Sequence, residues 1–308
     1  MSFADRFDQT KKTEFKDAAK LAADHNTSKL RHAVMEQPCS GEQAAPVLYY
    51  DSTKAKRRTG RVPTNRDNPA NRRRRWLKFQ PSFDQGEYID SEDLFRGMSD
   101  FQSPLHDNQA AAVRRFIDED VILEGMFGLA YEGELGSKPI AFPNSQVIAA
   151  DVTATGSTVS GLNLAKLKRS RKMFASHKHD LDKEDIYIAV TADQIDDLSN
   201  EIELKSKDYQ EEAGPQFSRT GKLTKVWNHV FIEYQNLTTK TSGGNLLQRV
   251  PAWLKSTYAL GVWQDVNSET IADSSRRGEL YMWAEANMDG RRLDETGVVE
   301  IECLLDNT

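Results

Sequence analysis

Hydrophobic residues follow two different periods along this chain, and the periods separate helices from strands. Apolar side chains recur every three or four positions within residues 105–127, which is typical of a helix with one buried face. We therefore predict a long helix there. Ser103 and Pro104 precede it, and these residue types suit the cap and the first helical position. The same spacing predicts shorter helices over residues 162–174 and 193–198.

Short apolar runs and the alternation of apolar with polar residues predict strands. These strands cover residues 47–50, 76–79, 186–190, 230–232 and 258–263. Two further strands are expected near the end of the chain, with Leu280, Met282, Ala284 and Ala286 on one face of the first and Val299, Ile301, Cys303 and Leu305 on one face of the second. Asp289 and Gly290 supply the turn region between them. The expected fold class is therefore α+β.

Charge is distributed very unevenly. The chain carries −6 overall, but the segment from Asp51 to Lys78 holds eleven basic residues against two acidic ones. That segment carries +9, and the remainder carries −15. It lies between two predicted strands and contains Pro63 and Pro69, so we predict a long hairpin with a basic tip. Because the tip has few apolar side chains, it is expected to be either mobile or docked on another molecule.

The residues that could carry chemistry exclude several classes of function. No run of about 18 apolar residues is present, so no membrane span is predicted. Cys39 and Cys303 are too few for a disulfide framework. Residues 136–138 lack the order of a phosphate-binding loop, and the spacing of His177 and His179 does not suit zinc on one helix face. We expect no catalytic site, no cofactor and no metal.

Three stretches of the chain resemble a known family. They read GLNLAKLK at 161–168, DIYIAVTADQ at 185–194 and RRLDETGVVEIEC at 291–303. Together with the order of an N-terminal arm, a basic hairpin, a long helix and an α/β lobe, they resemble the major capsid proteins of tailed phages with the Hong Kong 97-like fold. The resemblance in the order of elements covers nearly the whole chain, and recognisable sequence similarity covers about half of it. None of the three stretches is a catalytic signature.

The resemblance implies a division of the chain into an N-terminal arm 1–37, an extended loop 38–84, a peripheral domain with a spine helix 85–160, an axial domain 161–268 and return strands of the peripheral domain 269–308. It implies self-assembly into an icosahedral head of hexamers and pentamers that encloses double-stranded DNA. Scaffold, portal and decoration proteins are implied as further partners, and synthesis in the bacterial cytoplasm precedes incorporation into the virion. Some relatives crosslink a hairpin lysine, here Lys54 or Lys56, but no motif identifies its partners.

Opposite charges predict how copies join, with the basic hairpin of one copy on an acidic surface of the next. An exposed ion pair contributes only about 0–1 kcal/mol, so aromatic anchors are expected to add to the contact. The predicted contact residues are Lys56, Arg57, Arg58, Arg61, Arg72, Arg73, Arg74, Arg75, Trp76 and Phe79 on the hairpin, and Asp118, Glu119, Asp120 and Glu124 on the long helix, with residues 180–185 as an alternative acceptor. Replacing Arg72 to Arg75 with alanine is expected to leave a folded subunit that assembles poorly.

Two other interpretations of the basic segment stay open. Its arginines and Trp76 could bind nucleic acid by neutralising phosphates and stacking on bases, in which case affinity for naked DNA would fall steeply with salt. The segment could also be a solvated loop without a partner. The acidic net charge and the lack of a recognised nucleic-acid-binding module favour the contact between copies.

Overall fold

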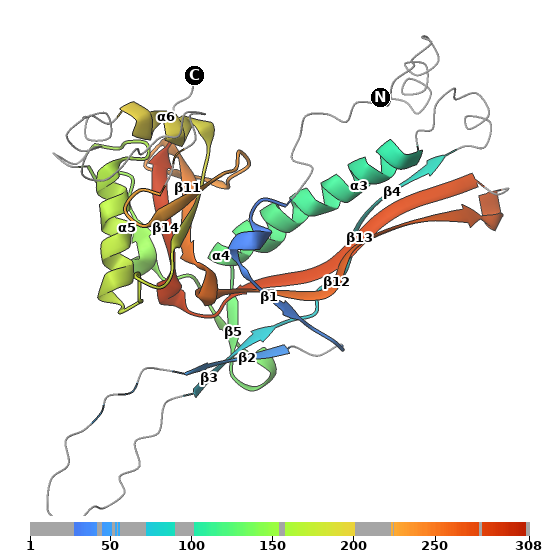
Figure 1. Ribbon diagram of the computed structural model, residues 1–308, viewed down its shortest axis with the longest axis horizontal. Helices are drawn as coiled ribbons and strands as arrows, with labels where there is room; N and C mark the ends of the chain where they lie inside the picture. Colours follow the sequence, from blue (N-terminus) through green and yellow to red (C-terminus); the bar gives the residue numbers. More distant parts are fainter. Residues whose placement is uncertain are drawn as a thin grey trace, which may run out of the picture.

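The computed structural model describes residues 28–41, 45–50, 72–89, 102–153, 158–200, 225–276 and 279–305, together with residues 53, 55 and 223. The strands in these segments form three sheets, and a helix covers one face of the longest sheet (Figure 1). This arrangement confirms the α+β class. None of the described helices is long and apolar enough to cross a lipid bilayer.

The long helix of the sequence prediction consists of consecutive helical elements. They are α3 (Gln102–Phe116), the π-helix η2 (Ile117–Leu123) and α4 (Glu124–Phe127). The observed start precedes the predicted residue 105, and the π-helical part was not predicted. Val113 and Ile117 are buried, as their spacing predicted. Phe116 is exposed instead and lies against Phe83, with 4.6 Å between the ring centroids.

The two shorter helices are confirmed. They are α5 (Leu164–Ser176) and α6 (Ala192–Asn200). Asn163 caps α5, because its side chain accepts a hydrogen bond from the backbone nitrogen of Lys166 at 2.8 Å. Short 3-10 helices connect other elements: η1 (Arg31–Ala33), η3 (Glu134–Gly136), η4 (Asn144–Gln146), η5 (Lys255–Thr257), η6 (Ser274–Arg276) and η7 (Glu295–Gly297).

The first sheet, called the long sheet here, has the strand order β1-β12-β13-β4. Its strands are β1 (Met35–Pro38), β12 (Tyr258–Asp273), β13 (Glu279–Arg292) and β4 (Phe83–Ile89). Helix α3 contacts β4, β12 and β13 and runs along one face of the sheet (Figure 1). Met282, Ala284 and Ala286 are buried, which confirms the predicted inner face of β13.

The turn predicted at Asp289 and Gly290 is wrong, because both residues lie inside β13 and pair with β12. Gly290 has a packing role instead. A Cβ atom at this position would lie 2.1 Å from the hydroxyl oxygen of Tyr258, so only glycine leaves room for that buried side chain. The glycine marks the close approach of β13 to the side chain of Tyr258 and to the carbonyl oxygen of Val121 in η2, and not a change of direction.

The second sheet, called the six-stranded sheet, has the order β7-β14-β11-β8-β9, and β10 pairs with β11. Its strands are β7 (Val147–Ile148), β14 (Val298–Leu304), β11 (Asn245–Leu254), β8 (Ile186–Val190), β9 (His229–Glu233) and β10 (Thr239–Ser242). Helix α5 contacts β7 and β14, and the lobe occupies one end of the molecule (Figure 1).

The last two strands therefore do not share a sheet, although the sequence placed both in the part 269–308. Strand β14 joins the sheet of the part 161–268, and strand β12 continues across the predicted boundary between residues 268 and 269. The helix η7 separates the strands, and the side chain of Asp294 accepts a hydrogen bond from the backbone of Thr296 at its start. This turn carries the chain from one sheet to the other.

The third sheet, called the hairpin sheet, has the order β2-β3-β5-β6. Its strands are β2 (Ala45–Tyr50), β3 (Arg72–Leu77), β5 (Ala130–Glu132) and β6 (Lys138–Ile140). Strands β2 and β3 are antiparallel, which confirms the stem of the predicted hairpin. Nearly all of the basic tip lies outside the described residues, as does most of the predicted N-terminal arm, residues 1–27.

One buried cluster connects the long sheet with the six-stranded sheet. It contains Val113 and Ile117 from the helical run, Met288 from the long sheet, and Val250 and Ile301 from the six-stranded sheet. The helical run thus packs at the junction of the two sheets. The hairpin sheet is attached beside this junction through β5, which follows α4 in the chain.

Candidate inter-subunit interface

The base of the hairpin is held inside the subunit by Arg75. This side chain is 2% exposed, and its Nε donates a hydrogen bond to the carbonyl oxygen of Leu293 at 3.1 Å. Its terminal nitrogens lie 2.7 Å from Glu295 and 3.7 Å from Glu132. The sequence assigned Arg75 to a contact with a neighbouring copy, and that contact stays a prediction. Within the subunit this buried cation is paired with carboxylates of its own chain.

Trp76 is also part of the subunit's own packing. It is 7% exposed, and its indole nitrogen donates a hydrogen bond to the carbonyl oxygen of Gly133 at 2.6 Å. Leu77 beside it is fully buried. Trp76 therefore fixes the hairpin to the loop after β5, and its predicted role as an anchor in a neighbour stays a prediction.

The other hairpin residues lie at the outer end of the described hairpin stem or beyond it. Arg74 is exposed, directly before the buried Arg75. Arg72 and Arg73 belong to β3, at the end of the stem that pairs with Tyr49 and Tyr50. The remaining predicted contact residues, Lys56, Arg57, Arg58 and Arg61, lie outside the described residues. Among the described side chains of β3, the change from buried to exposed lies between Arg75 and Arg74, and the outer residues stay predicted contacts.

Among the predicted acidic acceptors, Asp118 is the most buried, and its role in a contact between copies stays a prediction. It is 1% exposed and accepts hydrogen bonds from the hydroxyl of Ser28 at 2.6 Å and the backbone nitrogen of Lys29 at 2.9 Å. These contacts hold the segment before β1 against the helical run. A neighbouring cation could not reach this carboxylate without breaking them.

The other three acceptors lie nearer the surface. Glu119 is half-buried and accepts hydrogen bonds from Tyr234 at 3.1 Å and Asn236 at 2.7 Å. Asp120 and Glu124 are exposed. Partial burial and repulsion from Glu124 and Glu119 raise the pKa of Asp120 above its ordinary value. Such a group of carboxylates gains from a nearby cation, so these residues stay predicted acceptors.

The alternative acceptor at residues 180–185 is partly occupied by contacts within the chain. Lys183 lies 2.8 Å from Asp180, and Lys225 forms an ion pair with Asp185. Glu184 accepts hydrogen bonds from the backbone and the hydroxyl of Ser256 at 2.6 Å. This stretch therefore carries less uncompensated charge than its sequence suggests.

The histidines beside that stretch point to different partners. Nε2 of His177 lies 3.0 Å from the amide nitrogen of Gln146, and Nε2 of His179 lies 3.0 Å from the hydroxyl of Thr296. Within the described part of the chain, no group of three or more histidine, cysteine or carboxylate side chains is arranged to hold a metal ion.

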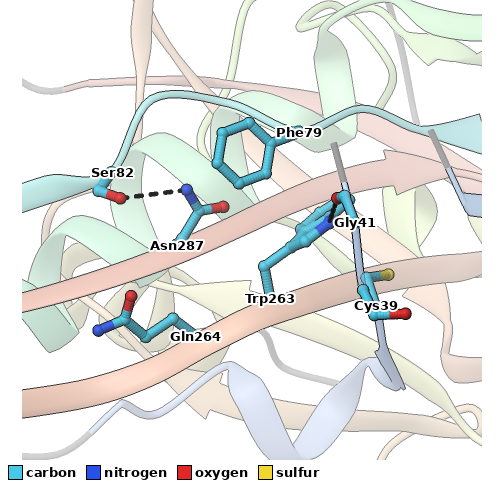
Figure 2. Close-up of a pocket in the computed structure, with 8 residues that line it drawn as sticks. Cys39, Gly41, Phe79, Ser82, Trp263, Gln264 and Asn287 are labelled. Atoms are coloured by element: carbon cyan, nitrogen blue, oxygen red, sulfur yellow. Dashed lines mark hydrogen bonds between the residues drawn. The ribbon is translucent and has the colours of Figure 1, made fainter. Parts of the chain in front are cut away.

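The sequence did not predict an open cavity that lies beside the base of the hairpin. Cys39, Phe79, Trp263 and Asn287 line this cavity of about 480 Å³ (Figure 2). Phe79 is 46% exposed, and its ring meets Trp263 edge-on with 5.9 Å between centroids. The sequence named Phe79 as a contact residue, but nothing local in the sequence brings together residues from β1, β12, β13 and the end of β3.

Comparison with known proteins identifies the family. A family described as phage capsid protein matches residues 7–305. The chain belongs to the phage capsid protein family. It is thus a major capsid protein, a structural subunit of the virion that self-assembles to form the phage head. No curated protein matches the chain.

Solved capsids share the fold of this capsid protein along nearly its full length. The capsid of cyanophage P-SCSP1u has 11% identity and a TM-score of 0.66, over 95% of this chain and 93% of that chain. The cyanophage Pam1 capsid has 11% identity and a TM-score of 0.68, over 96% and 97%. The capsid of Ralstonia phage GP4 has 10% identity and a TM-score of 0.68, over 96% and 97%. At these identities the likeness concerns the fold, and the Hong Kong 97-like fold is confirmed.

Proposed function

We propose that this capsid protein forms hexamers and pentamers in which the basic hairpin of each copy lies across an acidic surface of the next copy. The observation that carries this proposal is the abrupt end of burial along β3. Arg75, Trp76 and Leu77 are buried, whereas Arg74 is exposed. The hairpin thus has a base that is fixed in its own subunit, and most of the positive charge of the segment lies beyond this base in the sequence.

Rigidity at the base matters for assembly. A segment that is positioned before binding loses less conformational entropy when it docks than a freely moving one. Arg75 binds Leu293 and Glu295, which lie in the connection between the long sheet and the six-stranded sheet. The direction of the hairpin is therefore coupled to the junction of the two sheets.

The proposed place of each part in the shell follows from the sheets. The six-stranded sheet with α5 and α6 forms the axial part around the capsomer centre, and the long sheet with α3 forms the peripheral part. This division assigns β14 to the axial part, unlike the division made from the sequence, because β14 pairs with β11 and β7. The boundary between the parts then lies at η5 and η7.

The wider partners are part of the same proposal. The shell encloses double-stranded DNA without reading its sequence, and the acidic remainder of the chain keeps contact with the genome weak. Scaffold, portal and decoration proteins join the shell. Synthesis takes place in the cytoplasm of the bacterial host, and the protein has no enzymatic step of its own.

An assembly experiment tests the role of the hairpin. The triple change Arg57→Ala, Arg58→Ala and Arg61→Ala is expected to leave a folded subunit that forms few shells. The readout is electron microscopy and sedimentation of the overexpressed protein. Arg75 is left unchanged, because its replacement would disturb the subunit's own packing.

The matched control is Arg169→Ala, Arg171→Ala and Lys172→Ala, which removes the same charge from exposed positions on α5. It is expected to assemble normally. Normal shells from the hairpin triple variant would contradict the proposal. Steep salt-dependent binding of naked DNA by the wild-type subunit, lost in the hairpin variant while shells still form, would instead support nucleic-acid binding by the segment.

A further inference from the structure

We propose that the cavity lined by Phe79, Trp263 and Asn287 is a socket for one arginine side chain from the basic segment of a second copy. The inference rests on the proposed contact between copies and names the place where that contact is made. The arginine belongs to the part of the segment that includes Arg57, Arg61 and Arg66.

The walls of the socket offer two aromatic rings. Phe79 and Trp263 meet edge-on, and Phe79 keeps almost half of its surface exposed. The indole nitrogen of Trp263 donates a hydrogen bond to the carbonyl oxygen of Gly41 at 3.0 Å, which fixes that ring. A guanidinium group is attracted to such ring faces more often than an ammonium group, and it can stack on them because it is planar.

The floor of the socket offers an acceptor that has no donor among the described residues. Asn287 is 2% exposed, and its amide nitrogen donates to the carbonyl oxygen of Gln80 at 2.8 Å and to the hydroxyl of Ser82 at 3.2 Å. Because the carbonyl of Gln80 can only accept, these bonds fix the orientation of the amide. The oxygen Oδ1 is buried, and none of the described residues donates to it.

Figure 2 shows where this oxygen lies. The amide nitrogen of Asn287 turns toward Ser82, and Oδ1 turns to the opposite side, toward Phe79 and Trp263. A buried acceptor without a donor costs about 1–3 kcal/mol. A ligand that brings N–H groups between the rings would remove this cost once the exposed Phe79 ring moves aside. Arginine has five such donors.

Charge around the socket also favours a cation. Glu285 lies on β13, two residues before Asn287. It accepts a hydrogen bond at 2.6 Å from Gln264, which lines the cavity. Asp84 pairs with Glu285 across β4 and β13 and is exposed. Glu285 belongs to β13, which supplies the lining residue Asn287, and Asp84 follows the lining residue Ser82 by two positions. They attract the basic segment before any close contact forms.

The geometry of the stem favours a second copy over the same copy. The ladder of β2 and β3 starts at the pair Ala45 and Leu77 beside the cavity and ends at the pair Tyr50 and Arg72. The ladder rises by five residues of about 3.4 Å each, so its outer end lies roughly 17 Å from the base of the hairpin. To enter its own socket, the segment would have to double back over this distance, whereas about ten residues a side span up to roughly 33 Å toward a neighbour.

Native Cys39 lines the cavity and provides a direct test. Arg57→Cys, Arg61→Cys and Arg66→Cys are made singly, and each is co-expressed with an excess of the wild-type subunit, so that shells form even if a variant alone does not assemble. Purified shells are oxidised mildly and run on a denaturing gel without reductant. At least one variant is expected to give a dimer band that disappears with reductant and when Cys39→Ser is introduced in both chains.

The matched control is Lys183→Cys, because Lys183 is strongly exposed on the other lobe. It is expected to give no dimer with Cys39. In a variant that keeps the socket arginine and carries the cysteine beside it, Phe79→Ala in the partner subunit should lower the dimer yield roughly two- to tenfold, because one cation–π contact is lost. Since Phe79 is exposed, this change should leave folding intact.

Two results would overturn the socket. Shells that contain each of the three variants but no dimer would refute it while leaving the assembly role of the hairpin standing. A crosslink within one chain, seen as a faster monomer band, would show that the segment occupies its own cavity. The change of Arg57, Arg58 and Arg61 to alanine tests the assembly role of the hairpin, and a loss of shells in that variant does not say where the hairpin binds.

Discussion

The six-stranded sheet and the long sheet bury their strands to different depths. Strand β11 is buried throughout residues 250–254, whereas β12 is buried over residues 258–261 and exposed over residues 267–272. The six-stranded sheet is covered on both sides by its own subunit, so its strands contribute strongly to folding. The outer end of the long sheet contributes little to folding, which leaves its surface to contacts outside the subunit.

The outer end of β12 is also an open edge. Strand β1 pairs with β12 only as far as Val262, and no other described strand lies on that side beyond it. Irregular pairing around Gln264 twists the strand at this point. Asp265 and Glu269 are exposed along the edge, and such charges prevent uncontrolled strand pairing. The edge can therefore stay open in a subunit that must remain soluble before it assembles.

The largest effect is expected for Trp253→Ala in β11. Trp253 is fully buried, stacks on Tyr187 and donates a hydrogen bond to the carbonyl oxygen of Ala33 at 2.9 Å. The free energy of unfolding should fall by about 3–5 kcal/mol. Denaturant unfolding of the unassembled subunit measures it. A loss below about 1 kcal/mol would show that the six-stranded sheet does not dominate stability.

A somewhat smaller effect is expected at the junction of the two sheets. Arg75→Met should lower the free energy of unfolding by about 3 kcal/mol, because it leaves the carboxylate of Glu295 without its cation. Arg74→Met, one residue further out, is the control and should change it by less than about 0.5 kcal/mol. Equal effects of the two changes would mean that the buried arginine does not hold the hairpin.

The pH dependence should come from the six-stranded sheet. Burial lowers the pKa of His229 to about 4, from an ordinary value of 6.5. The folded state therefore binds fewer protons than the unfolded state between these values, and stability falls as the pH drops from 6.5 to 4. The loss attributable to His229 should reach about 3 kcal/mol.

The variant His229→Gln separates this effect from other acid-sensitive groups. Stability is measured by denaturant unfolding at several pH values for both proteins. The wild-type curve should be steeper between pH 6.5 and pH 4, whatever the absolute stability of the variant. Parallel curves would assign the acid sensitivity to other residues.

The smallest effect is expected at the outer end of the long sheet. Ile271 is 48% exposed and pairs with Tyr281 of β13. Ile271→Thr should change the free energy of unfolding by less than about 0.5 kcal/mol. Thermal unfolding beside Trp253→Ala gives the comparison directly. A large loss of stability would show that the exposed end supports the fold after all.

The sequence predicted local features well, because period and charge are local properties. The hairpin stem, α5, α6 and β8 follow from apolar spacing and turn residues within a short window. Strand β11 was missed because Gln248 and Arg249 interrupt its apolar run and Pro251 argues against a central strand. Its neighbours β14 and β8 override that local preference, and they are distant in sequence.

The candidate site was predicted only in part, and for a related reason. A charge count treats every arginine and aspartate as exposed, but Arg75 and Asp118 are buried. Their partners are Glu295 and Ser28, which lie far away along the chain. The cavity at Phe79 and Trp263 likewise needs four separate segments to meet. Such contacts follow from the topology of the sheets, which periodicity does not specify.

The anchoring of Asp118 sets a limit for protein engineering. Removal of residues 1–27 would leave its donors, Ser28 and the backbone nitrogens of Lys29 and Leu30, in place. Removal of three more residues would strand a negative charge beside the helical run, at a cost of several kcal/mol. Display fusions and affinity tags should therefore be joined ahead of Ser28, so that Ser28, Lys29 and Leu30 stay in place as donors to Asp118.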